Sequence, residues 1–342
     1  MSGSMITRGQ SFELATVGEA ANEAAARNVF ADYRSRKARN TLKGQAVTLA
    51  AFAEFLRRTG ANVGELGTDP EAWRGISWGL VEQFRNWLVM EGYSIGTVNV
   101  RLSTVKTYAK LAAKAGAISK EGWAMISLVE GYGHKDGKRL DEHRKAGGLE
   151  TRVSPKKADA TRLYEAHVHA LRSQPETPQG RRDRVMLALM LDLGLRVGEL
   201  AGLVVDDVDL ERGEITFYRS KVDKTQRHTL AVNGCLKAVR AYMEQDAPSE
   251  GRLLRASRHN GTLAGAGMTS RAITARVRKL GKELGLQSLS AHDLRHSWKD
   301  RAKEGKTQDT DLQEAGGWAS LAMVQRYGHP SKIANEGIKL AY

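Results

Sequence analysis

The chain has 342 residues, which is enough for two domains of ordinary size. Its 53 Lys and Arg residues outnumber 39 acidic residues, and the formal net charge of +14 favours a polyanion as partner. A single cysteine, Cys235, excludes an internal disulfide and favours a reducing compartment. No apolar run approaches the roughly 20 residues that cross a bilayer. We therefore expect a cytoplasmic, nucleoid-associated protein with no membrane partner.

The N-terminal part of the chain predicts a helical domain. Residues 1–26 are polar and are expected to form a flexible tail, and the helical domain is expected to span residues 27–133. Within it, apolar side chains recur at the spacing of one helix face in three stretches, namely residues 42–56, 81–88 and 98–112.

Basic side chains occupy the opposite faces of these expected helices. A solvated helix surface and a surface that faces duplex DNA explain this pattern about equally well. The candidates for DNA contact in this domain are Lys43, Arg101 and Lys106.

The next segment, residues 134–160, is rich in Lys, Arg, Gly and acidic residues and has few large apolar groups, so it predicts a linker. A second domain is expected over residues 161–342, including a C-terminal tail. An apolar helix over residues 184–193 is expected to end at Gly194 in the left-handed conformation. Further helices are expected over residues 197–203 and 269–284.

Two β-prone runs in the second domain predict a hairpin. Residues 214–218 and 227–232 are rich in β-branched and aromatic side chains, and they flank a basic turn over residues 221–224. The remainder of the domain has helical patterning. The predicted fold class is therefore mainly α with a small antiparallel β-sheet, in two domains.

The last fifth of the chain gathers groups that suit phosphodiester chemistry. Arg295 supplies a planar, charged donor set that fits two phosphate oxygens, and Tyr327 offers an oxygen nucleophile. His292 and His296 have a spacing that would also let them share a zinc ion. No third ligand follows at metal-site spacing, and Arg295 between them would repel a cation. The sequence therefore predicts no metal at this site.

Four segments, taken in order, resemble the tyrosine recombinase or phage integrase family. These segments are Gly194-Leu195-Arg196-Val197-Gly198-Glu199-Leu200, the hairpin lysines, His292-x-x-Arg295-His296 and Trp318-x8-Tyr327. The resemblance implies a tyrosine recombinase catalytic domain, preceded by a helical core-binding domain in residues 27–133. Any one of these segments could arise by chance, whereas all four in order are a specific signal.

The resemblance implies a role for each matched residue. Tyr327 is the expected nucleophile, and Arg196 and Arg295 would bind the non-bridging oxygens of the scissile phosphate. His292 and Trp318 would complete the catalytic set. Trp318 stands where many relatives carry His, and its indole N–H can donate a hydrogen bond but cannot exchange a proton.

Two further residues are expected to support the catalytic set, and one role has two candidates. Glu199 and His296 would brace their neighbours without reacting. The general acid for the leaving 5′-oxygen would be a hairpin lysine, with Lys221 at the family position and Lys224, also a candidate for DNA contact, as the second choice. Solvated turn residues remain an alternative explanation for both lysines.

The implied function is that of a site-specific recombinase, or integrase, which cleaves and rejoins DNA through a 3′-phosphotyrosyl intermediate. It would need no metal, ATP or other cofactor. The implied partners are double-stranded DNA and further copies of the chain, as a tetramer on DNA, and participation of accessory DNA-bending proteins stays open. The segment after Tyr327 would pack on its own domain or on a neighbouring subunit. Two alternatives are a type IB topoisomerase and a non-catalytic DNA-binding regulator on the same fold.

Overall fold

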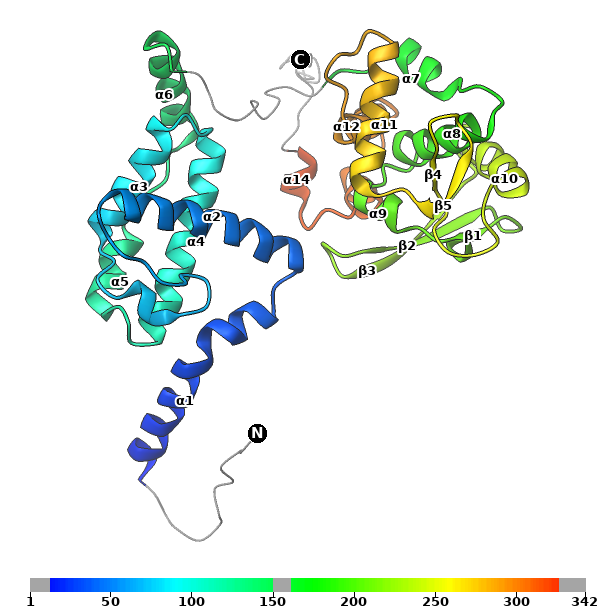
Figure 1. Cartoon of the computed structure of the whole chain (residues 1–342). Helices are drawn as coiled ribbons and strands as arrows, with labels where there is room; N and C mark the ends of the chain where they lie inside the picture. Colours follow the sequence, from blue (N-terminus) through cyan, green and yellow to red (C-terminus); the bar gives the residue numbers. More distant parts are fainter. Residues whose placement is uncertain (1–12, 150–160, 326–342) are drawn as a thin grey trace, which may run out of the picture. The chain divides into compact units, whose positions relative to one another are not determined.

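The computed structural model describes residues 13–149 and 161–325 of the chain. The chain divides into two compact units, residues 1–158 and residues 159–342, and each has its own hydrophobic core (Figure 1). Both are built mainly from helices, and small antiparallel sheets occur in the second, which confirms the predicted fold class. Within the described residues, no helix combines the length and the apolar character that crossing a bilayer requires.

The first unit is a helical bundle around an aromatic core. Phe52, Trp73 and Phe84 are fully buried, and the Trp73 indole N–H donates to the carbonyl of Leu66 at 2.9 Å. The elements are α1 (Leu14–Ser35), α2 (Arg39–Arg58), η1 (Pro70–Trp73), α3 (Trp78–Met90), α4 (Ile95–Lys114), α5 (Lys120–Ser127) and α6 (His134–Ala146).

Two helices of the first unit differ from the prediction. Helix α1 begins at Leu14, inside the segment that was expected to be a flexible tail. Helix α6 occupies part of the predicted linker, where large apolar residues are scarce. It is anchored by Arg144, which is buried and donates to the carbonyls of Val89 and Tyr93 at 2.6 and 2.9 Å. Hydrogen bonds from a buried guanidinium thus hold this helix, in place of the apolar residues that the prediction required.

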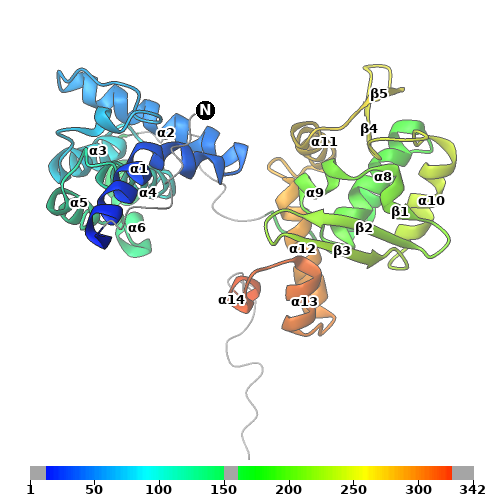
Figure 2. The ribbon, with the colours of Figure 1, turned by 90° about the horizontal axis from the view of Figure 1, so that it is seen from below.

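The second unit is built around helix α8 (Pro178–Leu191), whose last seven residues are all buried. Helix α8 packs against α7, α10 and α12, and Figure 2 shows α8 next to α10. The remaining elements are α7 (Glu165–Arg172), α9 (Val197–Gly202), η2 (Val205–Asp207), β1 (Val208–Asp209), β2 (Glu214–Arg219), β3 (Lys224–Thr229), α10 (Cys235–Gln245), β4 (Arg255–Ser257), β5 (Leu263–Gly267), α11 (Ser270–Glu283), α12 (Ala291–Glu304), α13 (Asp309–Gly316) and α14 (Leu321–Gln325).

The predicted hairpin is present, but its second strand begins three residues earlier than expected. Strands β1, β2 and β3 form an antiparallel sheet in that order, and Arg219 pairs with Lys224. The turn is closed by the N–H of Val222, which donates to the carbonyl of Arg219 at 3.1 Å. Lys224 therefore belongs to a strand, whereas Lys221 lies in the turn. A second sheet, formed by β4 and β5, was not predicted, because its Gly- and Ala-rich strand β5 lacks β-branched residues.

Candidate active site

The corner between α8 and α9 fixes the position of Arg196. Gly194 has a φ of +64°, as predicted, and a Cβ at this position would lie 2.3 Å from the ring of Trp298. The backbone N–H of Arg196 and its Nη1 donate to the two carboxylate oxygens of Glu199, each at 2.8 Å. This reciprocal contact at the start of α9 holds both the backbone and the side chain of Arg196.

Helix α12 positions Arg295. The helix begins with a capping box in which the backbone N–H of Ser290 donates to the carboxylate of Asp293 at 2.7 Å and the backbone N–H of Asp293 donates to the Ser290 hydroxyl at 3.4 Å. The side chain of Arg295 is buried, and it donates to the carbonyls of Gly194 and Gly316. One arginine thus joins the α8–α9 corner to the end of α13.

The Gly-Gly-Trp segment after α13 forms a close-packed turn. Gly317 has a φ of +57°, and a Cβ on Gly316 would lie 2.0 Å from the ring of Trp318. Trp318 stacks on Trp298, with ring centroids 5.9 Å apart, and the guanidinium of Arg295 lies 4.6 Å from the Trp318 ring. Trp318 is therefore part of the packing around Arg295, and its predicted role as a hydrogen-bond donor stays a prediction.

The structure adds one residue to this site that the sequence analysis missed. Arg219, the last residue of β2, is fully buried. It donates to the carbonyls of Ala315 and Gly316 at 2.7 and 2.8 Å, and it lies 3.4 Å from Glu199. The signal was present in the alternation of β2, where Ile215, Phe217 and Arg219 all face inward. An arginine at a strand end is usually solvated, so the predicted strand ended at residue 218 and left Arg219 out.

Arg196, Arg219 and Arg295, called the arginine cluster below, leave an excess of positive charge at this site. Glu199 is the carboxylate that contacts Arg196 and Arg219. Burial, reinforced by Arg196 and Arg219, lowers the pKa of Arg295 to about 9, and burial lowers the pKa of Arg219 to about 10. Both guanidinium groups are therefore charged near pH 7, and an anion that binds here would relieve their mutual repulsion.

The two histidines of α12 lie next to the arginine cluster. The rings of His292 and His296 are 4.3 Å apart and nearly perpendicular. Partial burial of the ring, and then the charge of Arg295, lower the pKa of His292, with smaller effects of Lys221 and Arg196. Burial, and then His292, lower the pKa of His296 to about 4. Both imidazoles are therefore neutral near pH 7, which leaves His292 able to accept a proton.

The two candidate lysines have different surroundings. Lys221 is exposed in the hairpin turn, and its charge makes a small contribution to the lowered pKa of His292. Lys224 lies in β3, and its Nζ is 3.0 Å from the carboxylate of Glu314 in α13. Lys224 thus has a partner in α13, and the functional role of either lysine stays a prediction.

If Lys221 is the acid that protonates the leaving oxygen, Lys221→Ala should slow DNA strand cleavage by about 10²–10⁴-fold. Lys224→Ala should change the rate only a few-fold. Single-turnover cleavage measures both. On DNA in which sulfur replaces the leaving 5′-oxygen, Lys221→Ala should regain most of the rate, since a thiolate leaves without a proton. If Lys224→Ala shows the larger defect and this recovery, the assignment is reversed.

The predicted nucleophile, Tyr327, lies outside the described residues. The described chain ends two residues before it, at the end of the short helix α14, where Val324 is fully buried. Within the described part, the structure brings together Arg196, Glu199, His292 and Arg295 with Trp318 and Lys221.

The predicted DNA contacts of the first unit differ in their surroundings. Lys43 is exposed on α2, as a DNA contact would be. The Nζ of Lys106 instead donates to the carbonyls of Ser127 and Val129 at 2.6 and 2.9 Å, which satisfies the end of α5. The guanidinium of Arg101 lies 4.1 Å from the ring of Tyr93. Lys106 and Arg101 thus have structural partners that their positions on a polar helix face did not reveal.

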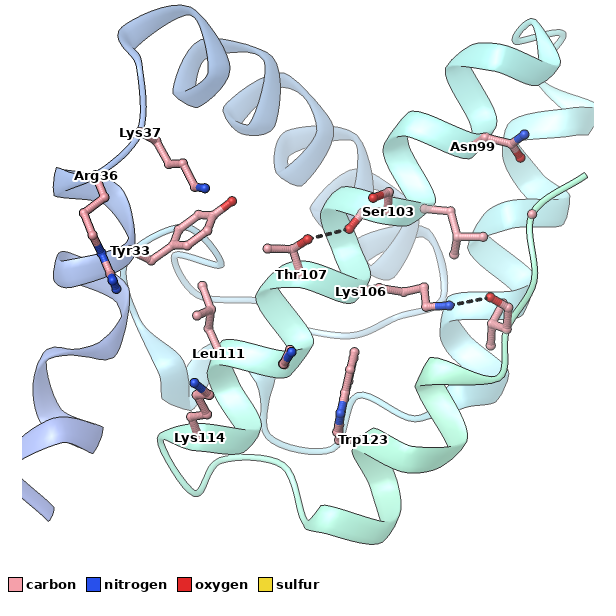
Figure 3. Close-up of a pocket in the computed structure, with 14 residues that line it drawn as sticks. Tyr33, Arg36, Lys37, Asn99, Ser103, Lys106, Thr107, Leu111, Lys114 and Trp123 are labelled. Carbon is pink, nitrogen blue, oxygen red and sulfur yellow. Dashed lines mark hydrogen bonds between the residues drawn. The ribbon is translucent and has the colours of Figure 1, made fainter. Parts of the chain in front are cut away.

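A basic groove lies where the end of α1 faces α4 and α5. This groove, with a volume of about 840 Å³, is lined by exposed cations on α4 and just after α1, and Figure 3 shows several of them around Tyr33 and Trp123. Its exposed basic residues are Arg36, Lys37, Lys110 and Lys114. The sequence placed some of these residues on polar faces, but only the packing of α1 shows that they share one concave surface.

Comparison with known proteins decides the family. The profile described as "Phage integrase family" matches residues 161–333, about half of the 342-residue chain. The chain belongs to the phage integrase family. The match covers the α8–α9 corner, the hairpin, α12 and the Gly-Gly-Trp turn, which are the segments that carried the resemblance in the sequence.

Similar curated proteins are tyrosine recombinases. The chain is 28% identical to "Tyrosine recombinase XerC" of Roseiflexus castenholzii over 305 residues, which cover 87% of this chain and 85% of that protein. It is 30% identical to "Tyrosine recombinase XerC" of Pseudomonas aeruginosa over 233 residues, with coverages of 66% and 74%. These findings make the chain a tyrosine-type site-specific recombinase, and they do not favour a topoisomerase or a non-catalytic regulator.

Two solved structures share the fold. The Tn1549 transposon integrase in complex with transposon right-end DNA matches with a TM-score of 0.61 at 15% identity, covering 89% of this chain and 95% of that one. A lambda integrase tetramer bound to a Holliday junction matches with a TM-score of 0.57 at 15% identity, with coverages of 92% and 83%.

Proposed function

We propose that this recombinase cleaves and rejoins duplex DNA through a covalent bond between Tyr327 and a backbone phosphate. The observation that carries the proposal is the arginine cluster. The negative charge of its carboxylate partner Glu199 offsets only part of its positive charge. Arg196 precedes α9 and Arg295 lies in α12, and their guanidinium groups approach the same turn. Two planar cations so arranged suit the non-bridging oxygens of one phosphate.

The proposed reaction conserves the number of phosphodiester bonds. The oxygen of Tyr327 bonds to phosphorus, and the bond from phosphorus to the 5′-oxygen breaks. The tyrosine proton passes to a base, for which neutral His292 is suited, and Lys221 protonates the leaving oxygen. A 5′-hydroxyl of another strand then attacks the phosphotyrosyl bond and releases Tyr327.

In this sequence of steps the arginines stabilise charge and do not transfer protons. Charge builds on the phosphate oxygens in the transition state, and guanidinium groups held in a largely buried site stabilise that charge. Trp318 packs against Arg295 and presents an indole N–H as a further donor. Each strand exchange regenerates a phosphodiester, so the residues named here need no external energy source.

We further infer that the chain acts on double-stranded DNA as a multimer, with a tetramer as the expected state. Exchange between two duplexes needs several nucleophiles, and the lambda integrase structure named above is a tetramer on a Holliday junction. The net charge of +14 and the basic groove supply positive charge for the DNA backbone. The first unit would then serve as the core-binding domain, with residues 161–342 as the catalytic domain.

The decisive test is Tyr327→Phe on a nicked suicide substrate, from which the cleaved strand diffuses away. Wild-type protein should accumulate a denaturation-resistant protein–DNA adduct, and mapping should find the DNA on Tyr327. The Phe variant should bind the same DNA with near-equal affinity and form no adduct, because it lacks the nucleophile. Tyr342→Phe is the matched control and should leave the adduct intact. Adduct formation by Tyr327→Phe would assign another nucleophile, and no adduct with wild-type protein would contradict the proposal.

The basic groove gives a second test. We expect simultaneous replacement of Lys37, Lys110 and Lys114 by Gln to weaken binding to any duplex and to lower the slope of log affinity against log salt by up to about 3, since each lost phosphate contact lowers it by about 1. Lys120→Gln, an exposed change outside the groove, should leave the slope unchanged. An unchanged slope in the triple variant would remove the groove from the DNA-binding surface.

A further inference from the structure

Arg219 is the most deeply buried arginine of the cluster, with no exposed surface, whereas Arg295 is 4% exposed. The side chain of Arg196 is 21% exposed. Both terminal nitrogens of Arg219 donate to main-chain carbonyls at the end of α13, to Ala315 at 2.7 Å and to Gly316 at 2.8 Å. Because Arg196 and Arg295 keep some exposed surface and Arg219 has none, we assign the phosphate contacts to Arg196 and Arg295 and not to Arg219.

We propose that Arg219 is a positioning residue for strand cleavage, holding the turn after α13 in place while Arg196 and Arg295 bind the phosphate. This inference rests on the proposed function. It adds a residue that the motifs in the sequence do not include and that forms no contact with DNA.

The hydrogen bonds of the turn explain why a third arginine is needed. The carbonyl of Gly316 accepts from both Arg219 and Arg295, and the carbonyl of Gly317 accepts from Arg196 at 2.8 Å. These carbonyls end a helix and carry its partial negative charge, so they compete with phosphate oxygens for the same donors. When Arg196 and Arg295 turn toward a phosphate, Arg219 retains its bonds to Ala315 and Gly316.

The turn is fitted to Arg219 sterically as well. Gly317 has a φ of +57°, and a Cβ there would lie 2.5 Å from Cδ of Arg219. Beneath the guanidinium lies the ring of Phe217, with its centroid 4.8 Å from Cζ. Arg219 is thus packed between a ring and a glycine, which fixes its direction along with its hydrogen bonds.

The position of the turn matters for the reaction because of the residues that follow it. The next residue is Trp318, which packs on Arg295, and the chain then enters α14 and leads to Tyr327. A shift of the turn would therefore displace the indole and the approach of the nucleophile together. Misplacement by about 1 Å is enough to slow a reaction by about 10²-fold.

A salt bridge to Glu199 accounts less well for the presence of a buried arginine at position 219. The closest approach of Arg219 to that carboxylate is 3.4 Å, whereas Arg196 contacts it at 2.8 Å through both its backbone and its side chain. The shorter bonds of Arg219 go to the turn.

The experiment measures single-turnover cleavage of a suicide substrate at saturating DNA by Arg219→Met, Arg219→Lys and a control. The control is Arg227→Met, which changes an exposed arginine of β3 in the same hairpin, 3.4 Å from Glu214. We expect Arg219→Met to cleave about 10²-fold more slowly with DNA affinity within two-fold of wild type. Arg219→Lys should recover part of the rate, because one ammonium can reach one of the two carbonyls. Arg227→Met should cleave at the wild-type rate.

A substrate with sulfur in place of the leaving 5′-oxygen separates positioning of the turn from positioning of Lys221. It should restore Lys221→Ala and leave Arg219→Met slow, since the turn leads to Trp318 and Tyr327 and not to the acid. Restoration of Arg219→Met by sulfur would overturn the inference, and so would a cleavage rate equal to that of Arg227→Met. If Arg219→Met does not fold, Arg219→Lys decides: slow cleavage with normal affinity supports the inference, and a wild-type rate overturns it. Wild-type adduct formation at Tyr327 tests the proposed function separately.

Discussion

Arg295→Met is expected to slow strand cleavage by about 10³-fold while DNA affinity changes little. The side chain of Arg295 is 4% exposed, and its guanidinium lies against Trp318 and points to the same turn as Arg196. Loss of one preorganised donor to a developing negative charge typically costs 10²–10³-fold in rate. The upper end applies here, because a whole charge is removed from a site that excludes most water.

Stability should change much less than activity in this variant. Methionine fills a similar volume and removes the repulsion that Arg295 experiences from Arg196 and Arg219. It leaves the carbonyl of Gly194 without this donor, whereas the carbonyl of Gly316 keeps its bond from Arg219. These effects oppose one another, so we expect the free energy of unfolding to change by no more than about 2 kcal/mol.

Arg182→Met provides the matched control for this prediction. Arg182 is also a buried arginine of the second unit, but it contacts Asp183 at 2.8 Å and the carbonyl of Arg255 at 2.7 Å, outside the arginine cluster. Urea denaturation and single-turnover cleavage of the two variants should give opposite rankings, with stability reduced mainly in Arg182→Met and cleavage reduced mainly in Arg295→Met. Equal cleavage rates for folded protein would show that Arg295 has no special part in the reaction.

Much of the site could be predicted from sequence because its parts are fixed by local geometry. The Gly194 corner and the contact between Arg196 and Glu199 lie within one helical turn, and the spacing of Arg196 and Glu199 alone places them on one face. His292 and Arg295 share one turn of α12 in the same way. Short-range rules therefore gave the parts, and the family resemblance indicated that they belong to one site.

What sequence reasoning missed depends on contacts between distant segments. The hydrogen-bond partners of Arg219 are carbonyls nearly 100 positions away in the chain, and those of Lys106 are carbonyls at the end of another helix. The predicted start of β3 was wrong because Lys224 is polar and was assigned to the turn. The register of the hairpin instead depends on the conformation of the turn, in which Asp223 has a φ of +49°. Such partners cannot be read from the spacing of residues along one segment.

Gly194→Ala is expected to be among the most destabilising single changes in the second unit, with a loss of about 2–4 kcal/mol in the free energy of unfolding. An alanine at a φ of +64° costs about 1 kcal/mol through backbone strain alone. The added Cβ would also lie 2.3 Å from the ring of Trp298, a rigid side chain that stacks on Trp318. Relief of this overlap requires movement of the indole, and overpacking of this kind costs 1–3 kcal/mol or more.

Gly213→Ala separates the two contributions, because Gly213 has the same φ of +64° but a different neighbour. A Cβ there would lie 3.3 Å from the end of the flexible Leu236 side chain, which can move aside. Urea denaturation should therefore show a loss of about 1 kcal/mol for Gly213→Ala. Equal losses for the two variants would mean that the backbone conformation, and not the approach of Trp298, accounts for glycine at position 194. A larger loss for Gly194→Ala, reduced when Trp298 is also replaced by Leu, would show that the corner carrying Arg196 and the indole pair beside Arg295 form one packed unit.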